Sequence, residues 1–224
     1  MAYKTMNELM ADYRAHAAAN RWIEAHDVLV YMVQCGNLRA KLELARLYKD
    51  SIHLGLQQER YRKAEFYYHS ILNLPDLSNE DMARISLEVA ELYTTYMKRP
   101  IGGLAMLLRG KRLGAHVPDR EVDHVRQLLM NLDVNDFCKF SRDAYVLGIE
   151  LSLAGGGARM IEFLLRAACE SSDELIRGKA SLALADFYND RRNENYIYAG
   201  EATRCYRQAL EAGFPEYLSR HNRV

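Results

Sequence analysis

The sequence has few of the residues that interrupt helices. Only 4 prolines and 13 glycines occur among its 224 residues, and both residue types are costly inside a helix. It also has no convincing run of β-branched residues alternating with polar ones, which is the pattern of a half-buried strand. These absences predict an all-α protein, and the chain is long enough for a continuous hydrophobic core.

Signals for secretion and membrane insertion are lacking too. The stretch from Met1 to Glu8 has neither the basic head nor the apolar run of a secretory signal. No apolar stretch reaches the length of about 18 residues that a membrane-spanning helix needs. We therefore expect a cytoplasmic protein with no membrane insertion.

Residues with reactive side chains form no recognisable catalytic or metal-binding motif. The four cysteines contain no C-x-x-C pair, so we expect buried, reduced thiols and neither a zinc knuckle nor a disulfide framework. The 7 histidines form no H-E-x-x-H pattern, and no serine lies in a nucleophile elbow. The glycines at 155–157 lack the preceding strand and the lysine of a phosphate-binding loop. We expect no enzyme activity, catalytic residue, cofactor or metal.

Positive and negative charges balance. The 30 basic and 30 acidic residues give a formal net charge of 0, whereas a general polyanion-binding protein carries an excess of positive charge. The balance makes nucleic acid an unlikely partner but is compatible with a local charged patch.

What the sequence does contain is a recurring helical pattern. It reads LELARLY over 42–48, LEVAELY over 87–93 and LALADFY over 182–188. In each copy apolar residues fall at helical spacing, a small alanine lets a neighbouring helix approach, and a tyrosine one turn later fills the gap. A second amphipathic segment follows each copy. The pattern predicts a stack of helix pairs, with the recurring segment in the first helix of a pair, called helix A, and the following segment in helix B.

This arrangement resembles the Sel-one-like repeat, a longer-looped relative of the tetratricopeptide repeat. The first half of that motif is matched by Gly36, Ala40, Leu44, Ala45 and Tyr48. The second half is matched by Ala202, Tyr206, Ala209, Leu210 and Gly213. The resemblance covers roughly two thirds of the chain. It implies a right-handed α-solenoid and an assembly or signalling adaptor, of the kind found in bacterial envelope, secretion or virulence systems.

We expect one helical-repeat domain over 1–224, built from about five antiparallel helix pairs with one irregular repeat in the middle. The repeats are expected at 5–36, 38–74, 80–115, 119–170 and 174–213, followed by a C-terminal cap at 214–224. Within the irregular repeat we expect an additional helix at 119–131, helix A at 136–153 and helix B at 157–170. Asn20 and either Ser78 or Asn79 are expected to cap the helices that follow them. Trp22 is expected to be a packing anchor, with a platform for a ligand as the alternative.

The A helices share a row of basic residues. If Ala45, Ala90, Gly148 and Ala185 are equivalent, the basic row is Arg39, Arg84, Arg142 and Lys179. An apolar row is formed by Leu42, Leu87, Tyr145 and Leu182, and a mixed row by Arg46, Glu91, Ile149 and Asp186. In the related tetratricopeptide family these offsets line the concave surface, so the resemblance implies a groove for an extended or helical peptide with acidic groups. A merely solvated helix face would explain the basic row as well.

These observations predict a non-enzymatic protein–protein interaction adaptor or scaffold that binds a protein or peptide partner through the groove. One alternative is a nucleic-acid-binding helical repeat that stacks bases on its tyrosines. The net charge and the core positions expected for Tyr48, Tyr93 and Tyr188 count against it. The other alternative is a self-assembling structural protein, a homo-oligomer whose terminal helices pack end to end.

Overall fold

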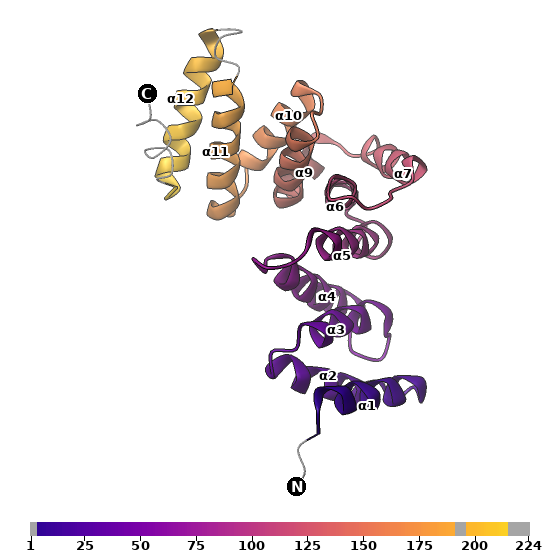
Figure 1. Cartoon of the computed structure of the whole chain (residues 1–224). Helices are drawn as coiled ribbons and strands as arrows, with labels where there is room; N and C mark the ends of the chain where they lie inside the picture. The colour runs from indigo at the N-terminus through magenta and orange to yellow at the C-terminus, as the bar shows by residue number, and fades with distance from the viewer. Residues whose placement is uncertain (1–3, 191–195, 215–224) are drawn as a thin grey trace. The chain divides into compact units, whose positions relative to one another are not determined.

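The computed structural model describes residues 4–190 and 196–214, and within these ranges every regular element is a helix (Figure 1). The all-α prediction is confirmed. Contacts between Cα atoms group the chain into two compact units, which are described separately below. Unit 1 comprises Met1–Lys98 and Leu113–Ala115, and unit 2 comprises Arg99–Arg112 and His116–Val224.

Unit 1 is a series of helices that pack on their neighbours in the chain. They are α1 (Met6–Ala18), α2 (Trp22–Gln34), α3 (Leu38–Asp50), α4 (Gln57–Leu72), α5 (Asn79–Glu91) and the π-helical turn η1 (Leu92–Tyr96). The pairs α1/α2 and α3/α4 fall within the predicted repeats at 5–36 and 38–74. Their core contains the fully buried Leu29, Met32 and Leu44, with Ala45 at the position of close helix approach.

Side-chain caps explain where several helices of unit 1 begin. Thr5 accepts a hydrogen bond from the Glu8 amide and the Glu8 carboxylate accepts one from the Thr5 amide, which forms a capping box. Ser78 caps α5 by accepting from the Asp81 amide at 3.1 Å, as predicted. The prediction for Asn20 is wrong. Asn20 has a φ of 55° and lies just beyond the end of α1, because the left-handed conformation that ends a helix suits asparagine.

Unit 2 contains the irregular repeat and the last helix pair. Its helices are α6 (Pro100–Arg112), α7 (Asp119–Leu129), α8 (Val134–Lys139), α9 (Ser141–Leu153), α10 (Ala158–Cys169), α11 (Glu174–Asp190) and α12 (Tyr196–Glu211). Helices α9 and α10 pack together, as do α11 and α12, and α6 packs on α7 and α9. The additional helix predicted at 119–131 is present as α7.

The helix predicted at 136–153 is interrupted. Asp133 and Asp136 form a capping box that starts α8 early, and Phe140, with φ −103° and ψ 42°, separates α8 from α9. The interruption accompanies an aromatic contact, since Phe137 of α8 packs edge-on against Phe163 of α10 with ring centroids 5.1 Å apart. The predicted third pair at 80–115 consists of α5 and α6, which belong to different units, so that pairing stays a prediction.

The tyrosine of the recurring pattern joins helix A to the preceding helix B. In the first copy the Tyr48 hydroxyl lies 2.7 Å from Nε2 of His26 in α2. In the second copy the Tyr93 hydroxyl lies 2.7 Å from Nε2 of His69 in α4 and donates to Glu65 at 2.7 Å. The same residue of the pattern therefore makes the same kind of contact twice within unit 1.

In unit 2 the tyrosine of the pattern also contacts the preceding helix B, but with different partners. Tyr188 donates to Glu162 of α10 at 2.7 Å, and Nε of Arg166 donates to the Tyr188 hydroxyl at 3.0 Å. Burial raises the pKa of Tyr188 above its ordinary value, with the neighbouring Glu162 acting in the same direction. The recurrence supports equivalence of the three copies at the level of single contacts.

Only the first residue of the predicted cap at 214–224 lies within the described residues. The ring of Phe214 rests on Gly178 of α11, where an added Cβ would come within 2.3 Å of the ring. Glycine is therefore required at 178 for this close approach. None of the helices in the described ranges combines the length and apolar character needed to cross a bilayer.

Candidate peptide-binding grooves

A groove of about 440 Å³ in unit 1 brings together several of the predicted partner-binding residues. It lies between the N-terminal halves of α3 and α5, and its predicted members are Arg39, Leu42, Arg46 and Arg84. Its apolar lining also includes Ile71 of α4, Ile85 of α5 and Leu77. We call this site the basic groove.

Two arginines of the basic groove are exposed. Arg39 makes no side-chain hydrogen bond or ion pair with any described residue, and Arg84 pairs only with Asp81, one turn earlier, at 2.5 Å. The Arg84 and Asp81 side chains are 58% and 43% exposed, so this pair is readily opened by a competing carboxylate. The positive ends of α3 and α5 add to the positive potential of the groove.

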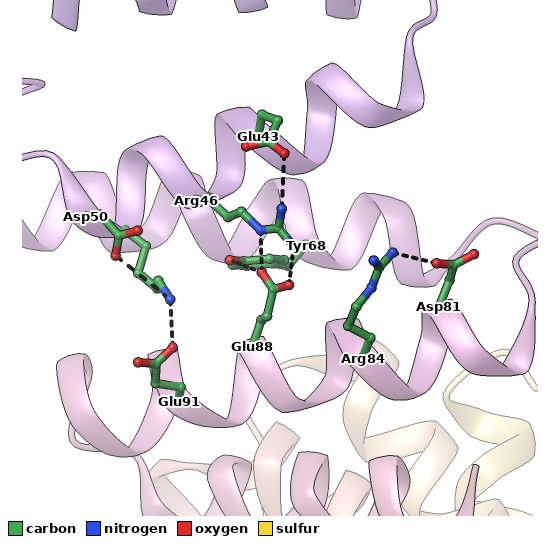
Figure 2. A network of polar contacts seen from close by, with 9 residues as sticks. Glu43, Arg46, Asp50, Tyr68, Asp81, Arg84, Glu88 and Glu91 are labelled. Carbon is green, nitrogen blue, oxygen red and sulfur yellow. Dashed lines mark hydrogen bonds and ion pairs between the residues drawn. The ribbon is translucent and has the colours of Figure 1, made fainter. Parts of the chain in front are cut away.

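Arg46 is held by acidic residues of the protein itself (Figure 2). Its Nη2 and Nε atoms lie 2.5 and 3.0 Å from the Glu88 carboxylate oxygens, and its Nη1 atom lies 3.1 Å from Glu43. Tyr68 of α4 donates to the same Glu88 carboxylate at 2.9 Å. This network joins α3, α4 and α5, so Arg46 is part of the groove wall.

The electrostatics of the network follow from these contacts. The hydrogen bonds to Glu88 raise the pKa of Arg46 above its ordinary value. Burial by itself would raise the pKa of Glu88, but the hydrogen bonds from Arg46 and Tyr68 outweigh burial and lower it. The pair is therefore fully ionised at neutral pH.

Glu91 of the predicted mixed row has a similar structural contact. Nζ of Lys49 lies 2.6 Å from the Glu91 carboxylate and connects the C-terminal ends of α3 and α5. The Lys49 side chain is only 10% exposed, whereas that of Glu91 is 50% exposed. Leu87 lies on α5, is partly buried and is not among the residues that line the basic groove.

A second hollow of about 430 Å³ adjoins the basic groove, because Glu43 and Arg46 line both. Its aromatic members are Tyr13, Trp22 and His53, and the rings of Trp22 and His53 stack with centroids 6.4 Å apart. We call it the aromatic hollow.

The sequence patterns did not point to the aromatic hollow. Trp22 is partly buried at the first position of α2, whereas the core positions of that helix are Ala25, Leu29 and Met32. The one sequence signal for a surface role of Trp22 is its position at the start of a helix, next to a loop. Ile52, which also lines the hollow, is 74% exposed.

The predicted residues of unit 2 do not gather in the same way. Arg142 and Lys179 are exposed near the N-terminal ends of α9 and α11. Tyr145 is partly buried against the core that contains Leu182, which is only 9% exposed. Leu182 is therefore a core residue.

Ile149 and Asp186 instead line a different groove, of about 590 Å³, between the C-terminal halves of α9 and α11. We call it the acidic groove. Its apolar lining residues are Ile149, Leu153, Ile161, Leu165, Ala183 and Phe187, and its polar side chains are Ser152, Asp186 and Asp190. Gly155 and Gly156 form part of its rim.

A smaller hollow of about 330 Å³ is lined by residues of α10, α11 and α12. It contains three arginines, and each contacts a glutamate of its own helix: Arg166 with Glu162, Arg177 with Glu174, and Arg204 with Glu201. Glu170 and Glu211 line the hollow as well, so acidic and basic side chains are mixed in it.

All four cysteines are free thiols. Burial raises the pKa of Cys205 to about 11 and also raises that of Cys169, which keeps both protonated at neutral pH. Cys35 is exposed, so the prediction of burial is wrong for this residue, which follows the last turn of α2.

No group of three or more histidine, cysteine, aspartate or glutamate side chains in the described part of the chain is arranged to hold a metal ion. Comparison with models of known protein families finds no match, and comparisons with curated proteins and with solved structures find none either. The membership in the Sel-one-like repeat family that the sequence suggested stays a prediction.

Proposed function

We propose that the protein is a non-enzymatic adaptor or scaffold that binds an acidic, partly apolar segment of a partner protein in the basic groove. In this proposal the helix pairs continue as a right-handed α-solenoid of the Sel-one-like type, and the basic groove is part of its binding surface. The proposal concerns recognition alone and assigns no chemical step to the chain.

The observation that carries the proposal is the pair of exposed arginines above an apolar floor. Arg39 has no acidic partner among the described residues, and Arg84 holds only the exposed Asp81. A guanidinium group binds a carboxylate with two parallel hydrogen bonds, which gives both affinity and orientation. The existing contact with Asp81 supports the idea that a carboxylate fits at Arg84.

The aromatic hollow supports a ligand that extends beyond the arginines. Trp22 and His53 present a stacked pair of rings beside the exposed Ile52. Partly buried aromatic side chains of this kind are favourable anchor sites for an apolar side chain of a bound peptide. A peptide that places acidic groups near Arg39 and an apolar residue near Trp22 would use both parts of the surface.

The positions of the tyrosines favour this proposal over nucleic-acid binding. Tyr48, Tyr93 and Tyr188 are 6%, 3% and 1% exposed, so their rings offer no platform for stacking bases. A self-assembling protein would give a mass above that of the monomer in light scattering at micromolar concentration.

Selection from a random peptide library displayed on phage would test the proposal. Wild-type protein should enrich peptides that combine aspartate or glutamate with apolar residues. The double variant Arg39→Glu, Arg84→Glu should lose these peptides, because it reverses both exposed charges of the basic groove.

The matched control is Arg142→Glu, Lys179→Glu, which reverses two exposed charges of the same predicted row in unit 2. This control should keep the acidic peptides. Equal enrichment by the basic-groove variant and by wild type would overturn the proposal, provided that circular dichroism shows both variants to be folded.

A further inference from the structure

We infer that the acidic groove of unit 2 is a second docking site, for a segment of a protein partner that carries lysine or arginine beside apolar residues. This site lies on a different unit from the basic groove, and its argument does not depend on the proposed function.

The backbone makes the acidic groove negative. Most of its lining residues come from the C-terminal halves of α9, which ends at Leu153, and of α11, which ends at Asp190, while Ile161 and Leu165 come from α10. Carbonyl groups without partners in the helix concentrate partial negative charge at these ends. Two helices therefore present the same sign of charge to one groove.

The side chains add to this negative charge. Asp186 is held in place by the Tyr206 hydroxyl, which donates to its Oδ1 atom at 2.7 Å. Asp190 is exposed and makes no ion pair or hydrogen bond with any described residue. No lysine or arginine is among the described residues that line the groove. A cationic group is the complementary ligand.

Part of the apolar surface of the groove is exposed. Leu153 is 60% exposed, and Ile149 and Ala183 are partly exposed. Phe187, which is 8% exposed, forms part of the floor. Contact with a partner would remove this apolar area from water, which is favourable by about 25 cal/mol per Å² of area buried.

Acidic and apolar side chains line the same groove, so one bound side chain can contact both. A lysine or arginine can lay its aliphatic stem on Leu153 or Ile149 while its charged end reaches Asp190, which pairs with no described residue. Leucine could cover only the apolar surface, and the carboxylate of glutamate would be repelled by the aspartates. A volume of about 590 Å³ has room for more than one side chain of a peptide.

The test is a titration of fluorescein-labelled, capped peptides followed by fluorescence anisotropy. The probe is a short peptide of alternating leucine and lysine pairs, and its control has every lysine replaced by glutamine. Wild-type protein should bind the lysine peptide at least about tenfold more tightly than the glutamine peptide.

Two variants locate the binding. Asp190→Lys should weaken binding of the lysine peptide about tenfold or more, and Leu153→Asn should weaken it by a smaller factor. Both positions are exposed, so both variants should fold. The matched control is Asp123→Lys, which makes the same change of charge on an exposed position of α7.

The inference is overturned if Asp190→Lys and Asp123→Lys weaken binding equally, because the peptide would then respond only to net charge. It is also overturned if neither variant changes the affinity. The variant Arg39→Glu, Arg84→Glu should bind the lysine peptide no less tightly than wild type does. Failure of this inference is therefore distinguishable from failure of the proposed function.

Discussion

The basic groove of unit 1 and the acidic groove of unit 2 are built on the same kind of helix but have opposite character. The basic groove uses the N-terminal halves of α3 and α5, whereas the acidic groove uses the C-terminal halves of α9 and α11. The exposed charged side chains are arginines in the basic groove and an aspartate in the acidic groove. The recurring pattern is shared by the helix pairs, whereas the charged residues of the two grooves differ.

A single position of the pattern illustrates the difference. Arg46 in LELARLY corresponds to Asp186 in LALADFY, and each lies near the tyrosine of its helix B. In unit 1 the Tyr68 hydroxyl and Arg46 both bond to the carboxylate of Glu88, which lies on the next helix A. In unit 2 the Tyr206 hydroxyl donates directly to Asp186.

The units also differ in how buried their ion pairs are. In unit 2, Arg99 contacts both carboxylate oxygens of Asp143, at 2.9 and 2.6 Å, and the Asp143 side chain is only 5% exposed. In unit 1 the Arg46 and Glu88 side chains are 33% and 18% exposed. We therefore expect the ion pair of unit 2 to matter more for stability.

The largest effect should come from Asp143→Ala. It leaves Arg99 of unit 2 without its buried carboxylate, which should lower the free energy of unfolding by about 3–5 kcal/mol in a urea titration. The double variant Arg99→Met, Asp143→Leu should recover most of this loss, because it removes both charges. A loss no larger than that of the exposed Asp123→Ala would contradict the contrast between the units.

Glu88→Gln should have the next largest effect and should act on unit 1. Loss of the charge-assisted hydrogen bonds should cost about 1.5–3 kcal/mol at pH 7. The pKa of Glu88 lies below its ordinary value of 4.5, so its stabilising contribution is complete above that pH and is lost as the pH falls through the folded-state pKa.

Urea titrations of wild type and Glu88→Gln at several pH values would measure this dependence. The difference between the two proteins should shrink in acid. A difference that stays constant from neutral pH to well below pH 4.5 would show that the charge of Glu88 is not what stabilises the network.

Ala45→Leu and Ala185→Leu would compare the equivalent core positions of the two units. Both alanines are 0% exposed, so a larger side chain should overpack the helix pair and cost about 1–3 kcal/mol in each unit. Thermal melting would measure the loss of stability in each variant. If only one variant lowers the melting temperature, the two copies of the pattern are not structurally equivalent.

The smallest effects should come from removing the hydroxyl of the recurring tyrosine. Tyr48→Phe, Tyr93→Phe and Tyr188→Phe should each cost about 0.5–1.5 kcal/mol, because each breaks a hydrogen bond to the preceding helix B. Similar losses of unfolding free energy in urea titrations would support the structural equivalence of the three copies. No loss at Tyr188 would separate the last copy from the others.

Local periodicity was enough to predict the all-α fold. It placed α7 and α10 close to their observed positions because helical spacing and small residues act within a few turns. Arg39 and Arg84 were candidates for a binding surface because they have the same offset from Ala45 and Ala90.

The remaining features depend on contacts between distant residues. Arg46 and Glu88 are 42 residues apart, so their pairing leaves no local signal. The break at Phe140 accompanies the contact of Phe137 with Phe163. Arg142 and Lys179 have the predicted spacing, but the groove between their helices opens at the opposite end. Offsets within a repeat therefore predict exposure better than they predict partners.

The most direct test of the central claim is a methyl NMR titration of wild-type protein with two peptides that differ only in charge, one with leucine and glutamate and one with leucine and lysine. The glutamate peptide should shift the signals of Leu42 and Ile85, and the lysine peptide those of Ile149 and Leu153. Both peptides shifting the same set of signals would contradict the claim that the two grooves select opposite charges.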